Sequence, residues 1–537
     1  MLLRKITIPF VLLFSACAQI VTPDGGPKDI APPRVVEYAP DSAATNFKGK
    51  KIVIRFNEYI ALNDLNKQLI ISPAVKRRPE VTIRKKELVI EFKDTLEANT
   101  TYSISFGKSI RDITENNVLN NFHYVFSTGP VIDSLTCSGQ VQGARTLRQE
   151  KGVLVMLYRN TSDSVPYKEK PYYYTRSDDQ GNFRLTNLAP ATYKIFVLED
   201  EGEDYLYNSS VERIAFSDSL IKLNSSIDSL RFLLFQEKPS SQSLLRSAQI
   251  APGHVQFAYN LSIVEPSVEF ISKLPSTMEP VVEYNEGRDT INIWFKKVEL
   301  DSVRFVVKSG TAALDTIEME LTKPTGKKPV RQGAIDPRAL VFSTNTSGGK
   351  LLPGNQFCIT LSNPIQSFDQ QKILMKCGRE TISAKIEISE NKHVIKFTNP
   401  FPEDSSFSVF IPPAAIIDWF GQKSDTIQAG FTVSHSRQFG NLSIKFPALT
   451  DGKYVVEVVD EKDRIVKDTV ISGKADCRFS LLAAGNYHIR IISDTDGNKK
   501  WTSGSYPEKK QAERVRYYYT SVRIRAGWDM DVEWGIQ

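Results

Sequence analysis

The segment Tyr102-Ser103-Ile104-Ser105-Phe106 alternates apolar and polar side chains over five residues. Successive side chains of a strand point to opposite faces of a sheet, so this pattern predicts a strand with one buried face. The same alternation recurs nearby, between breaks of Asn, Gly and Pro, at Ile52, Ile54 and Phe56, at Leu88, Ile90 and Phe92, and at Phe122, Tyr124 and Phe126. No long stretch has helical periodicity. The sequence therefore predicts an all-β fold.

This set of strands occurs twice, at a constant offset of 305 positions. Ile54, Phe56, Ile60, Val89, Phe92 and Tyr102 recur as Ile359, Leu361, Ile365, Val394, Phe397 and Phe407. Each copy then reaches an aspartate after a short apolar stretch, Asp112 or Asp418, and ends in one more strand. These segments are predicted to be two copies of one β-sandwich.

A second repeat follows each copy at an offset of 294 positions. Leu185, Leu188, Tyr193, Ile195 and Asp200 recur as Phe479, Leu482, Tyr487, Ile489 and Asp494. Between the two pairs, residues 238–335 alternate again and predict one more sandwich. The expected architecture is an elongated array of tandem β-sandwich domains, with boundaries at 1–16 (signal peptide), 17–31 (tether), 32–130, 131–237, 238–335, 336–436 and 437–537.

The N-terminus predicts export. Arg4 and Lys5 precede the apolar run Ile8–Phe14, which ends in small residues just before Cys17. This run is too short to span a bilayer and is typical of a signal peptide. Two cleavage sites fit: one leaves Cys17 as the first residue, and an A-x-A site at Ala16–Ala18 leaves Gln19.

Three stretches resemble known families. Phe14–Cys17 resembles a bacterial lipobox, although Phe14 stands where Leu is usual. Ala31–Val36, with Asn99–Tyr102 and Phe126–Gly129, looks like the S-layer type of bacterial Ig-like domain. The turn Asp179–Phe183, with the strand that follows it, is similar to carboxypeptidase-regulatory, transthyretin-like domains, which 131–237 and 437–537 would then be.

Together with Thr22–Asp29, these features resemble a family of Ig-like-domain lipoproteins of Bacteroidota. The resemblance implies a diacylated Cys17 that anchors the chain in a membrane, and an envelope protein without assigned chemistry. No acidic cluster follows Cys17 in Ala18–Thr22, so this segment lacks what resembles the surface-export signal of Bacteroidota lipoproteins. The resemblance therefore favours the periplasmic face of the outer membrane over the cell surface.

Composition excludes several classes of function. The formal net charge is +6, from 68 basic and 62 acidic residues that interleave along the chain, so no nucleic acid is expected as a partner. Beyond Cys17, the four cysteines are too scattered for a disulfide framework or a zinc site. Cys358 and Cys377 are interpreted either as a disulfide or as free thiols in apolar surroundings.

No catalytic motif is found, and the chain is predicted not to be an enzyme. G-x-S-x-G, P-loop and H-E-x-x-H patterns are missing from the sequence. The five histidines fall in separate predicted strands or loops, so no two are expected to share a metal or a proton. They are His123, His254, His393, His435 and His488.

The strongest candidate site is an acidic loop. Asp494, Asp496 and Asn498 stand at alternate positions, as at the start of a calcium loop, and calcium is the only cofactor expected. Ser505 at the twelfth position excludes an EF-hand. The partner repeat places Asp200 and Asp204 correspondingly. The alternative is a turn whose side chains accept hydrogen bonds from their own backbone.

A tripeptide of Asp, then Ser or Thr, then an aliphatic residue occurs at eleven positions. It is similar to the O-glycosylation site of exported Bacteroidota proteins, whereas a structural interpretation is that Asp closes a turn before the next strand. The two interpretations are compatible. The hydroxyl residues are Ser42, Thr95, Ser134, Ser164, Ser219, Ser229, Thr290, Ser302, Thr316, Thr426 and Thr469.

These observations lead to one expected function and two alternatives. The expectation is a non-catalytic outer-membrane lipoprotein that acts as a structural or interaction subunit with other envelope proteins. The alternatives are a glycan-binding surface lipoprotein and an accessory subunit of β-barrel assembly or secretion machinery.

Overall fold

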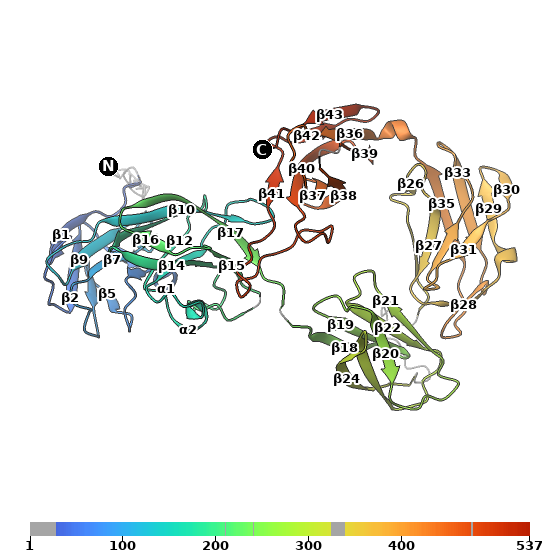
Figure 1. Cartoon of the computed structure of the whole chain (residues 1–537), viewed down its shortest axis with the longest axis horizontal. Coiled ribbons are helices and arrows are strands. Elements are labelled where there is room, and N and C mark those ends of the chain that lie inside the picture. Colours follow the sequence, from blue (N-terminus) through green and yellow to red (C-terminus); the bar gives the residue numbers. More distant parts are fainter. Residues whose placement is uncertain (1–27, 210, 240, 324–338, 474–475, 537) are drawn as a thin grey trace, which may run out of the picture. The chain divides into compact units, whose positions relative to one another are not determined.

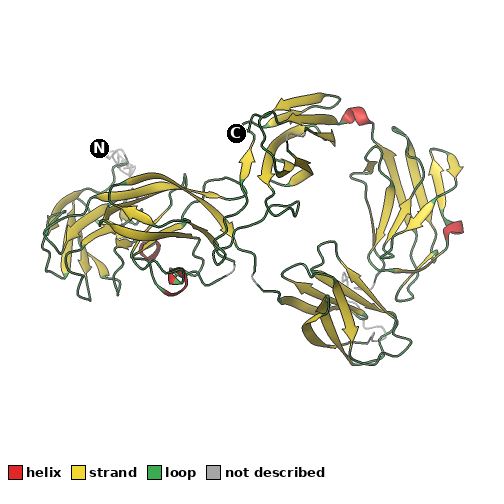
Figure 2. Cartoon of the chain, in the orientation of Figure 1, coloured by secondary structure: helices red, strands yellow, loops and turns green. Residues whose placement is uncertain are grey.

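The computed structural model describes residues 28–209, 211–239, 241–323, 339–473 and 476–536. Strands and loops make up almost all of this part, as Figure 2 shows, and the all-β fold is confirmed. The described helices are short: α1 (Leu65–Gln68), α2 (Val165–Lys168), and the 3-10 turns η1 (Gln370–Lys372) and η2 (Ser436–Gln438). The chain divides into two compact units, the first formed by residues up to 141, 149–207 and 215–232, and the second by 142–148, 208–214 and 233–537.

The first sandwich of the first unit, sandwich A, pairs its strands in the orders β1-β2-β6-β5 and β4-β7-β9, with β3-β8 as a separate pair. Side chains of alternate residues fill its core, including Ile52, Ile54, Tyr102 and Phe126. The ring of Tyr102 stacks on that of Phe126 at a centroid distance of 5.4 Å. The strands are β1 (Val35–Ala39), β2 (Lys51–Phe56), β3 (Ile60–Leu62), β4 (Ile70–Ser72), β5 (Glu80–Arg84), β6 (Glu87–Glu91), β7 (Thr101–Ser105), β8 (Ile110–Asp112) and β9 (His123–Ser127).

Sandwich A′, in the second unit, contains the strand order of A and adds an edge strand, β26 or β30, at each side of its second sheet. Its sheets are β25-β27-β32-β31 and β26-β35-β33-β29-β30, and its separate pair is β28-β34. Phe407 stacks on Phe431 at 5.4 Å, in the place of Tyr102 and Phe126. The strands are β25 (Phe342–Thr344), β26 (Lys350–Leu351), β27 (Phe357–Leu361), β28 (Ile365–Phe368), β29 (Leu374–Cys377), β30 (Glu380–Ile382), β31 (Ile386–Ile388), β32 (Val394–Phe397), β33 (Ser406–Ile411), β34 (Ile416–Asp418) and β35 (Ile427–Val433).

The middle sandwich of the second unit follows the same plan in shortened form. Its sheets, β18-β19-β22-β21 and β20-β23-β24, repeat the order of sandwich A without a counterpart of the β3-β8 pair among the described residues. A tight turn at Gly310 therefore joins its last two strands directly. The strands are β18 (Leu244–Ala251), β19 (His254–Tyr259), β20 (Pro266–Phe270), β21 (Pro280–Tyr284), β22 (Thr290–Phe295), β23 (Ser302–Ser309) and β24 (Ala312–Glu320).

Sandwich B comes after A in the chain and has the strand order β12-β11-β14-β15-β17-β10-β13, with β16 on β14. Tyr193, buried in its core, donates a hydrogen bond to the carbonyl of Ala189 at 2.8 Å. The strands are β10 (Leu135–Gly143), β11 (Leu154–Tyr158), β12 (Tyr173–Arg176), β13 (Asn182–Leu188), β14 (Ala191–Leu198), β15 (Arg213–Phe216), β16 (Ile221–Leu223) and β17 (Ile227–Gln236).

Sandwich B′ ends the chain and repeats B as two sheets, β38-β37-β40-β41 and β39-β36-β43, with β42 on β40 (Figure 1). Tyr487 donates the same hydrogen bond as Tyr193, to Ala483 at 2.9 Å. The strands are β36 (Gly440–Lys445), β37 (Lys453–Val459), β38 (Ile465–Ser472), β39 (Cys477–Leu482), β40 (Gly485–Ser493), β41 (Val515–Tyr517), β42 (Val522–Ile524) and β43 (Asp529–Glu533).

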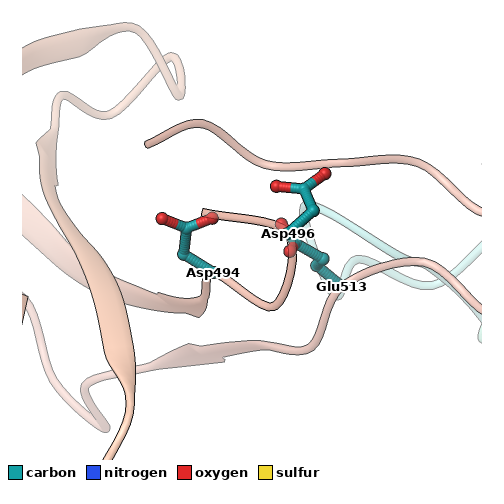
Figure 3. Close-up of side chains that lie close together, drawn as sticks. All are labelled: Asp494, Asp496 and Glu513. Carbon is teal, nitrogen blue, oxygen red and sulfur yellow. The ribbon is translucent and has the colours of Figure 1, made fainter. Parts of the chain in front are cut away.

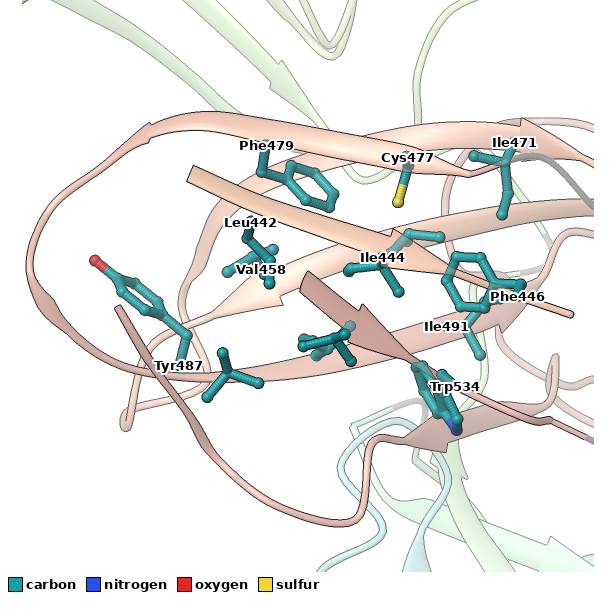
Figure 4. Packing of buried hydrophobic residues seen from close by; sticks show 14 of the residues in the cluster. Leu442, Ile444, Phe446, Val458, Ile471, Cys477, Phe479, Tyr487, Ile491 and Trp534 are labelled. Atoms are coloured by element: carbon teal, nitrogen blue, oxygen red, sulfur yellow. The ribbon is translucent and has the colours of Figure 1, made fainter. Parts of the chain in front are cut away.

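Figure 4 shows the core of sandwich B′ between its sheets. Leu442 and Ile444 from β36 meet Val458 and Ile491 from the other sheet, and all four are at most 2 % exposed. Apolar burial of this kind provides about 25 cal/mol per Å² and holds the strands that carry the loops described below.

Candidate functional site

Three carboxylates lie together at one end of sandwich B′ (Figure 3). Asp494 follows β40 directly, Asp496 lies two residues further along the same loop, and Glu513 comes two residues before β41. One oxygen from each carboxylate lies within 4.8 Å of the others. The pairing of β40 with β41 brings Glu513 to the loop, since Ser493 donates its backbone N–H to Arg514.

Hydrogen bonds from the loop hold two of these carboxylates in place. Glu513, only 4 % exposed, accepts the backbone N–H and hydroxyl of Thr495 at 2.6 and 2.8 Å. It also accepts the N–H of Thr502 at 2.9 Å. Asp496 accepts from the backbone of Asn498 at 3.0 Å and from the hydroxyl of Thr502 at 2.7 Å. The carboxylates thus set the shape of the loop from 494 to 513.

Asp494 is different, because one of its buried oxygens has no partner. The residue is 5 % exposed, and Oδ2 accepts the backbone N–H of Lys499 at 3.2 Å. Oδ1 is buried without a hydrogen-bond partner. A cavity of about 520 Å³ beside it is lined by Asp494, Asp496, Lys453 and Gly497, among others. A buried carboxylate oxygen without a donor is costly, so this atom points to a ligand.

The pKa of Asp496 lies below its ordinary value. The hydrogen bond from Thr502 is the main cause, burial opposes it, and the N–H of Asn498 and the charge of Lys510 add to it. Asp496 is therefore ionised at neutral pH.

In the structure, the other residues of the predicted acidic site form hydrogen bonds within their own turns. Asn498 uses its amide oxygen for the N–H of Lys500 at 2.7 Å. In sandwich B, Asp200 accepts the N–H groups of Asp204 and Tyr205 at 3.3 and 2.9 Å, as a self-bonded turn does. Glu513 was missed from sequence because it lies far along the chain from Asp494. The only signal for it is an acidic residue just before an apolar strand.

A second cluster lies within the second unit, where the middle sandwich meets A′. Glu283 accepts from Trp294 Nε1 at 2.9 Å and is 3.0 Å from His393 Nε2. His393 Nδ1 lies 2.8 Å from the carbonyl of Leu361, so both ring nitrogens face acceptors. Burial opposes protonation, but these two hydrogen bonds and the charge of Glu283 raise the pKa of His393 above 6.5.

His254 belongs to the same cluster, although it has no hydrogen-bond partner in common with His393 among the described contacts. Its ring stacks on Trp294 at a centroid distance of 3.6 Å, and the ring of His393 is tilted against Trp294 at 5.6 Å. His254 Nε2 lies 3.0 Å from the side-chain oxygen of Asn292. Alternation within one sandwich gave no signal for this arrangement, because it depends on contact between two sandwiches.

The two aspartates of the sequence repeat are buried turn caps. Asp112 is 1 % exposed and accepts the backbone N–H groups of residues 115, 116 and 117. Asp418 is fully buried and accepts from the backbone of Phe420 and Gln422 and from the side chain of Asn363. Burial opposes ionisation of Asp112, but its three N–H partners lower its pKa.

The surfaces next to these turns differ. In A′, Trp419 donates from Nε1 to the carbonyl of Glu279 at 3.2 Å, and the ring of Phe420 is 5.8 Å from that of Trp294. In A, the corresponding Ile113 is 57 % exposed, beside Tyr59 at 55 %. In both, the residue after the aspartate donates its N–H to the carbonyl of the residue just before β3 or β28: Ile113 to Tyr59 and Trp419 to Pro364.

The other predicted sites fall as follows. None of the eleven glycosylation candidates is buried; Ser42, Thr95, Ser134, Ser219, Ser229, Thr316 and Thr426 are exposed, and Ser164, Thr290, Ser302 and Thr469 are half-buried. Modification at these residues stays a prediction. Cys358 and Cys377 are free thiols on β27 and β29, in opposite sheets.

Cys17 and the signal segment lie outside the described residues. Within the ranges that are described, no helix has the length and apolar character needed to cross a membrane.

Residues 29–128 match the family described as bacterial Ig-like domain, which identifies sandwich A as a domain of that class. A comparison with curated proteins finds no match.

Solved structures align at low identity. The S-layer protein rSbsC(31-844) aligns with 86 % of this chain and 64 % of its own length, at 10 % identity and a TM-score of 0.14. BcpA, the major pilin subunit of Bacillus cereus, aligns with 75 % and 99 %, at 8 % and 0.13. The Bacillus anthracis TIE protein aligns with 96 % and 76 %, at 11 % and 0.14. At these TM-scores nothing about the function of this chain follows from the alignments.

Proposed function

We propose that this chain is a non-catalytic outer-membrane lipoprotein that acts as a structural and interaction subunit of an envelope protein complex. In this proposal Cys17 carries the lipid anchor, the chain faces the periplasm, and the sandwiches present surfaces to other envelope proteins.

The observation that carries the interaction role is the contrast between the turns at Asp112 and Asp418. Each turn is capped by its buried aspartate, and in A′ the apolar residues after it, Trp419 and Phe420, contact another sandwich. In A the same position presents Ile113 and Tyr59 to solvent, with the ammonium of Lys86 5.4 Å from the Tyr59 ring. An exposed aromatic and aliphatic pair on a rigid turn is a suitable anchor for a protein partner.

The interaction role is tested by affinity capture from outer membranes of the host, followed by mass spectrometry. We expect wild-type protein to capture a defined envelope partner and the double variant Tyr59→Ser, Ile113→Ser to lose it. Val264→Ser, which changes a 71 % exposed residue of the middle sandwich, is the matched control. Equal capture by all three proteins would contradict a role for this surface.

The anchor is tested separately. Cys17→Ala is expected to abolish labelling by palmitate and to release the protein from the membrane fraction. A processed variant that remains membrane-bound would contradict lipid anchoring.

A further inference from the structure

We propose that Asp494, Asp496 and Glu513 form a binding site for a hard divalent cation, and that the ion is Ca²⁺. The site goes beyond the interaction role proposed above and does not depend on it. It belongs entirely to sandwich B′ of the second unit.

The first argument is electrostatic. Asp494 and Glu513 are 5 % and 4 % exposed, and their carboxylates lie within 4.8 Å of each other and of Asp496. Their described partners are N–H and hydroxyl groups, apart from a side-chain contact between Asp494 and Asp496, and none of the three forms an ion pair with a described lysine or arginine. Buried like charges without a compensating cation are strongly unfavourable.

The second argument is the unpartnered oxygen. None of the described hydrogen bonds reaches Asp494 Oδ1, a buried atom of a residue that belongs to the cluster and lines the cavity beside it. An acidic turn that only closes on its own backbone, as at Asp200, satisfies both oxygens. A cation at the cluster provides the missing partner.

The third argument concerns size. Two oxygens on opposite sides of Ca²⁺, each about 2.4 Å from the ion, are about 4.8 Å apart. The three carboxylate oxygens lie within this distance of one another, so one ion can contact all three. Mg²⁺ requires a tighter and nearly ideal octahedron, with opposite oxygens about 4.2 Å apart. The three carboxylates come from an irregular loop and from the residues just before a strand, an arrangement that suits the more flexible coordination of Ca²⁺, with water or hydroxyl oxygens completing its ligands.

Three lysines near the cluster do not replace the ion. Lys453 is exposed and lines the cavity. Lys510 acts on Asp496 through its charge alone, and Lys499 contributes its backbone N–H to Asp494. Neither of the buried carboxylates is paired with any of them.

The consequence of binding is an ordered loop. Between Asp494 and Glu513 the loop places Trp501 against Val455, Ile492 and Val515, and Trp501 Nε1 donates to the carbonyl of Glu513 at 3.1 Å. Further along, Ser503 donates to the carbonyl of Gln236, and Tyr506 donates its N–H to Glu237. An ion that ties both ends of the loop together also stabilises these contacts within the second unit.

The test uses the full chain after treatment with EDTA and removal of the chelator. Isothermal titration with CaCl₂ should show one site of about micromolar Kd, with Mg²⁺ at least about tenfold weaker. The midpoint temperature for thermal unfolding of sandwich B′, which contains Trp501, should rise by about 5 °C or more at saturating Ca²⁺. Tb³⁺ should give emission sensitised by Trp501 that Ca²⁺ displaces.

Asp494→Asn and Glu513→Gln keep the side-chain shape and remove the charge, and each should weaken Ca²⁺ binding about 100-fold. Glu508→Gln, an exposed acid in the same loop, and Asp200→Asn, the equivalent residue of B, should bind Ca²⁺ as the wild type does. A wild type without heat, thermal shift or displaceable Tb³⁺ emission overturns the proposal. Unchanged Ca²⁺ affinity in both isosteric variants also overturns it. The Tb³⁺ measurement on wild-type protein decides the matter even if a variant fails to fold.

Discussion

Sandwiches A and A′ share a strand order, a stacked aromatic pair and a buried aspartate, yet their ends face different surroundings. In A′ the turn after Asp418 contacts the middle sandwich through Trp419 and Phe420. In A the turn after Asp112 is exposed at Ile113. The comparison teaches that the aspartate fixes the backbone of the turn, while the one or two residues after it decide what the turn contacts.

The middle sandwich is a third case for this comparison, because it lacks one of the elements that A and A′ share. It has the two main sheets of A and A′ but no equivalent of the β3-β8 pair in the part that the structure describes. The two main sheets therefore suffice for a core, and the extra pair with its aspartate serves the end of the sandwich. This division between core and end can be tested.

The largest expected loss of stability comes from the aromatic pair that the cores of A and A′ have in common. Phe126→Ala and Phe431→Ala each remove a buried ring that stacks on a neighbouring aromatic, and each should lower the free energy of unfolding of its own sandwich by about 3–5 kcal/mol. Urea denaturation of the full chain measures this. A loss below about 1 kcal/mol in one sandwich only would show that the two cores are not equivalent.

Loss of the turn cap should come next. Asp418→Ala removes three hydrogen bonds to a buried carboxylate and should destabilise A′ by about 2–4 kcal/mol. It should also shift tryptophan fluorescence to longer wavelength, because Trp419 loses its position. Asp112→Ala should destabilise A without a fluorescence change, since A contains no tryptophan. A fluorescence shift in both variants would contradict the view that only the turn of A′ positions a tryptophan.

The capped turn of A should also respond to acid. The pKa of Asp112 is lower in the folded protein than its ordinary value of 3.8. The stability from this carboxylate is therefore fully present above pH 3.8 and is lost as the pH falls through the folded pKa. Acid unfolding of A should shift to higher pH in Asp112→Asn, as monitored by circular dichroism. Superimposable acid transitions would contradict the assignment.

A smaller effect is expected at the contact between the middle sandwich and A′. His393 has a raised pKa, so its pairing with Glu283 stabilises the contact fully below pH 6.5 and weakens as the pH rises through the higher folded pKa. Melting of this part, followed by Trp294 fluorescence, should occur at lower temperature as the pH rises over that window. His393→Gln should remove the dependence, whereas His123→Gln in A should leave it intact.

The smallest effect concerns a surface exchange. Arg55 in A forms exposed ion pairs with Glu37 and Glu87, and the corresponding residue of A′ is Thr360. Arg55→Thr should change stability by less than about 1 kcal/mol. A larger loss in denaturant unfolding would show that the charges, and not the core, distinguish the two copies.

The sequence was sufficient for the fold class and for the features that recur within one sandwich. Period-two alternation located Ile54, Tyr102 and Phe126 because burial of one sheet face imposes that period. The repeat marked Asp112 and Asp418, although their role as buried turn caps required hydrogen bonds that no pattern reports. The middle sandwich shares the strand order but not the β3-β8 pair, so its kinship with A was not visible.

The sequence did not predict which residues from different strands or sandwiches lie in contact. Glu513 meets Asp494 only because β40 and β41 pair, and nothing in the spacing of the two residues indicates that pairing. His254, Trp294 and His393 come together through the packing of two sandwiches, which alternation within either one does not determine. Local patterns specify which face is buried, and they leave open what a loop or a sandwich end will contact.

Sandwich B′ begins and ends with neighbouring strands that run in the same direction. Asn441 to Lys445 in β36 pair in register with Asp529 to Glu533 in β43. Because the strands are parallel, tension applied to the two ends of this sandwich pulls them lengthwise past each other. All the hydrogen bonds between them then bear the load together, whereas an antiparallel hairpin pulled from its open end breaks them one after another. We therefore expect sandwich B′ to resist extension more strongly than a sandwich whose terminal strands pair as an antiparallel hairpin.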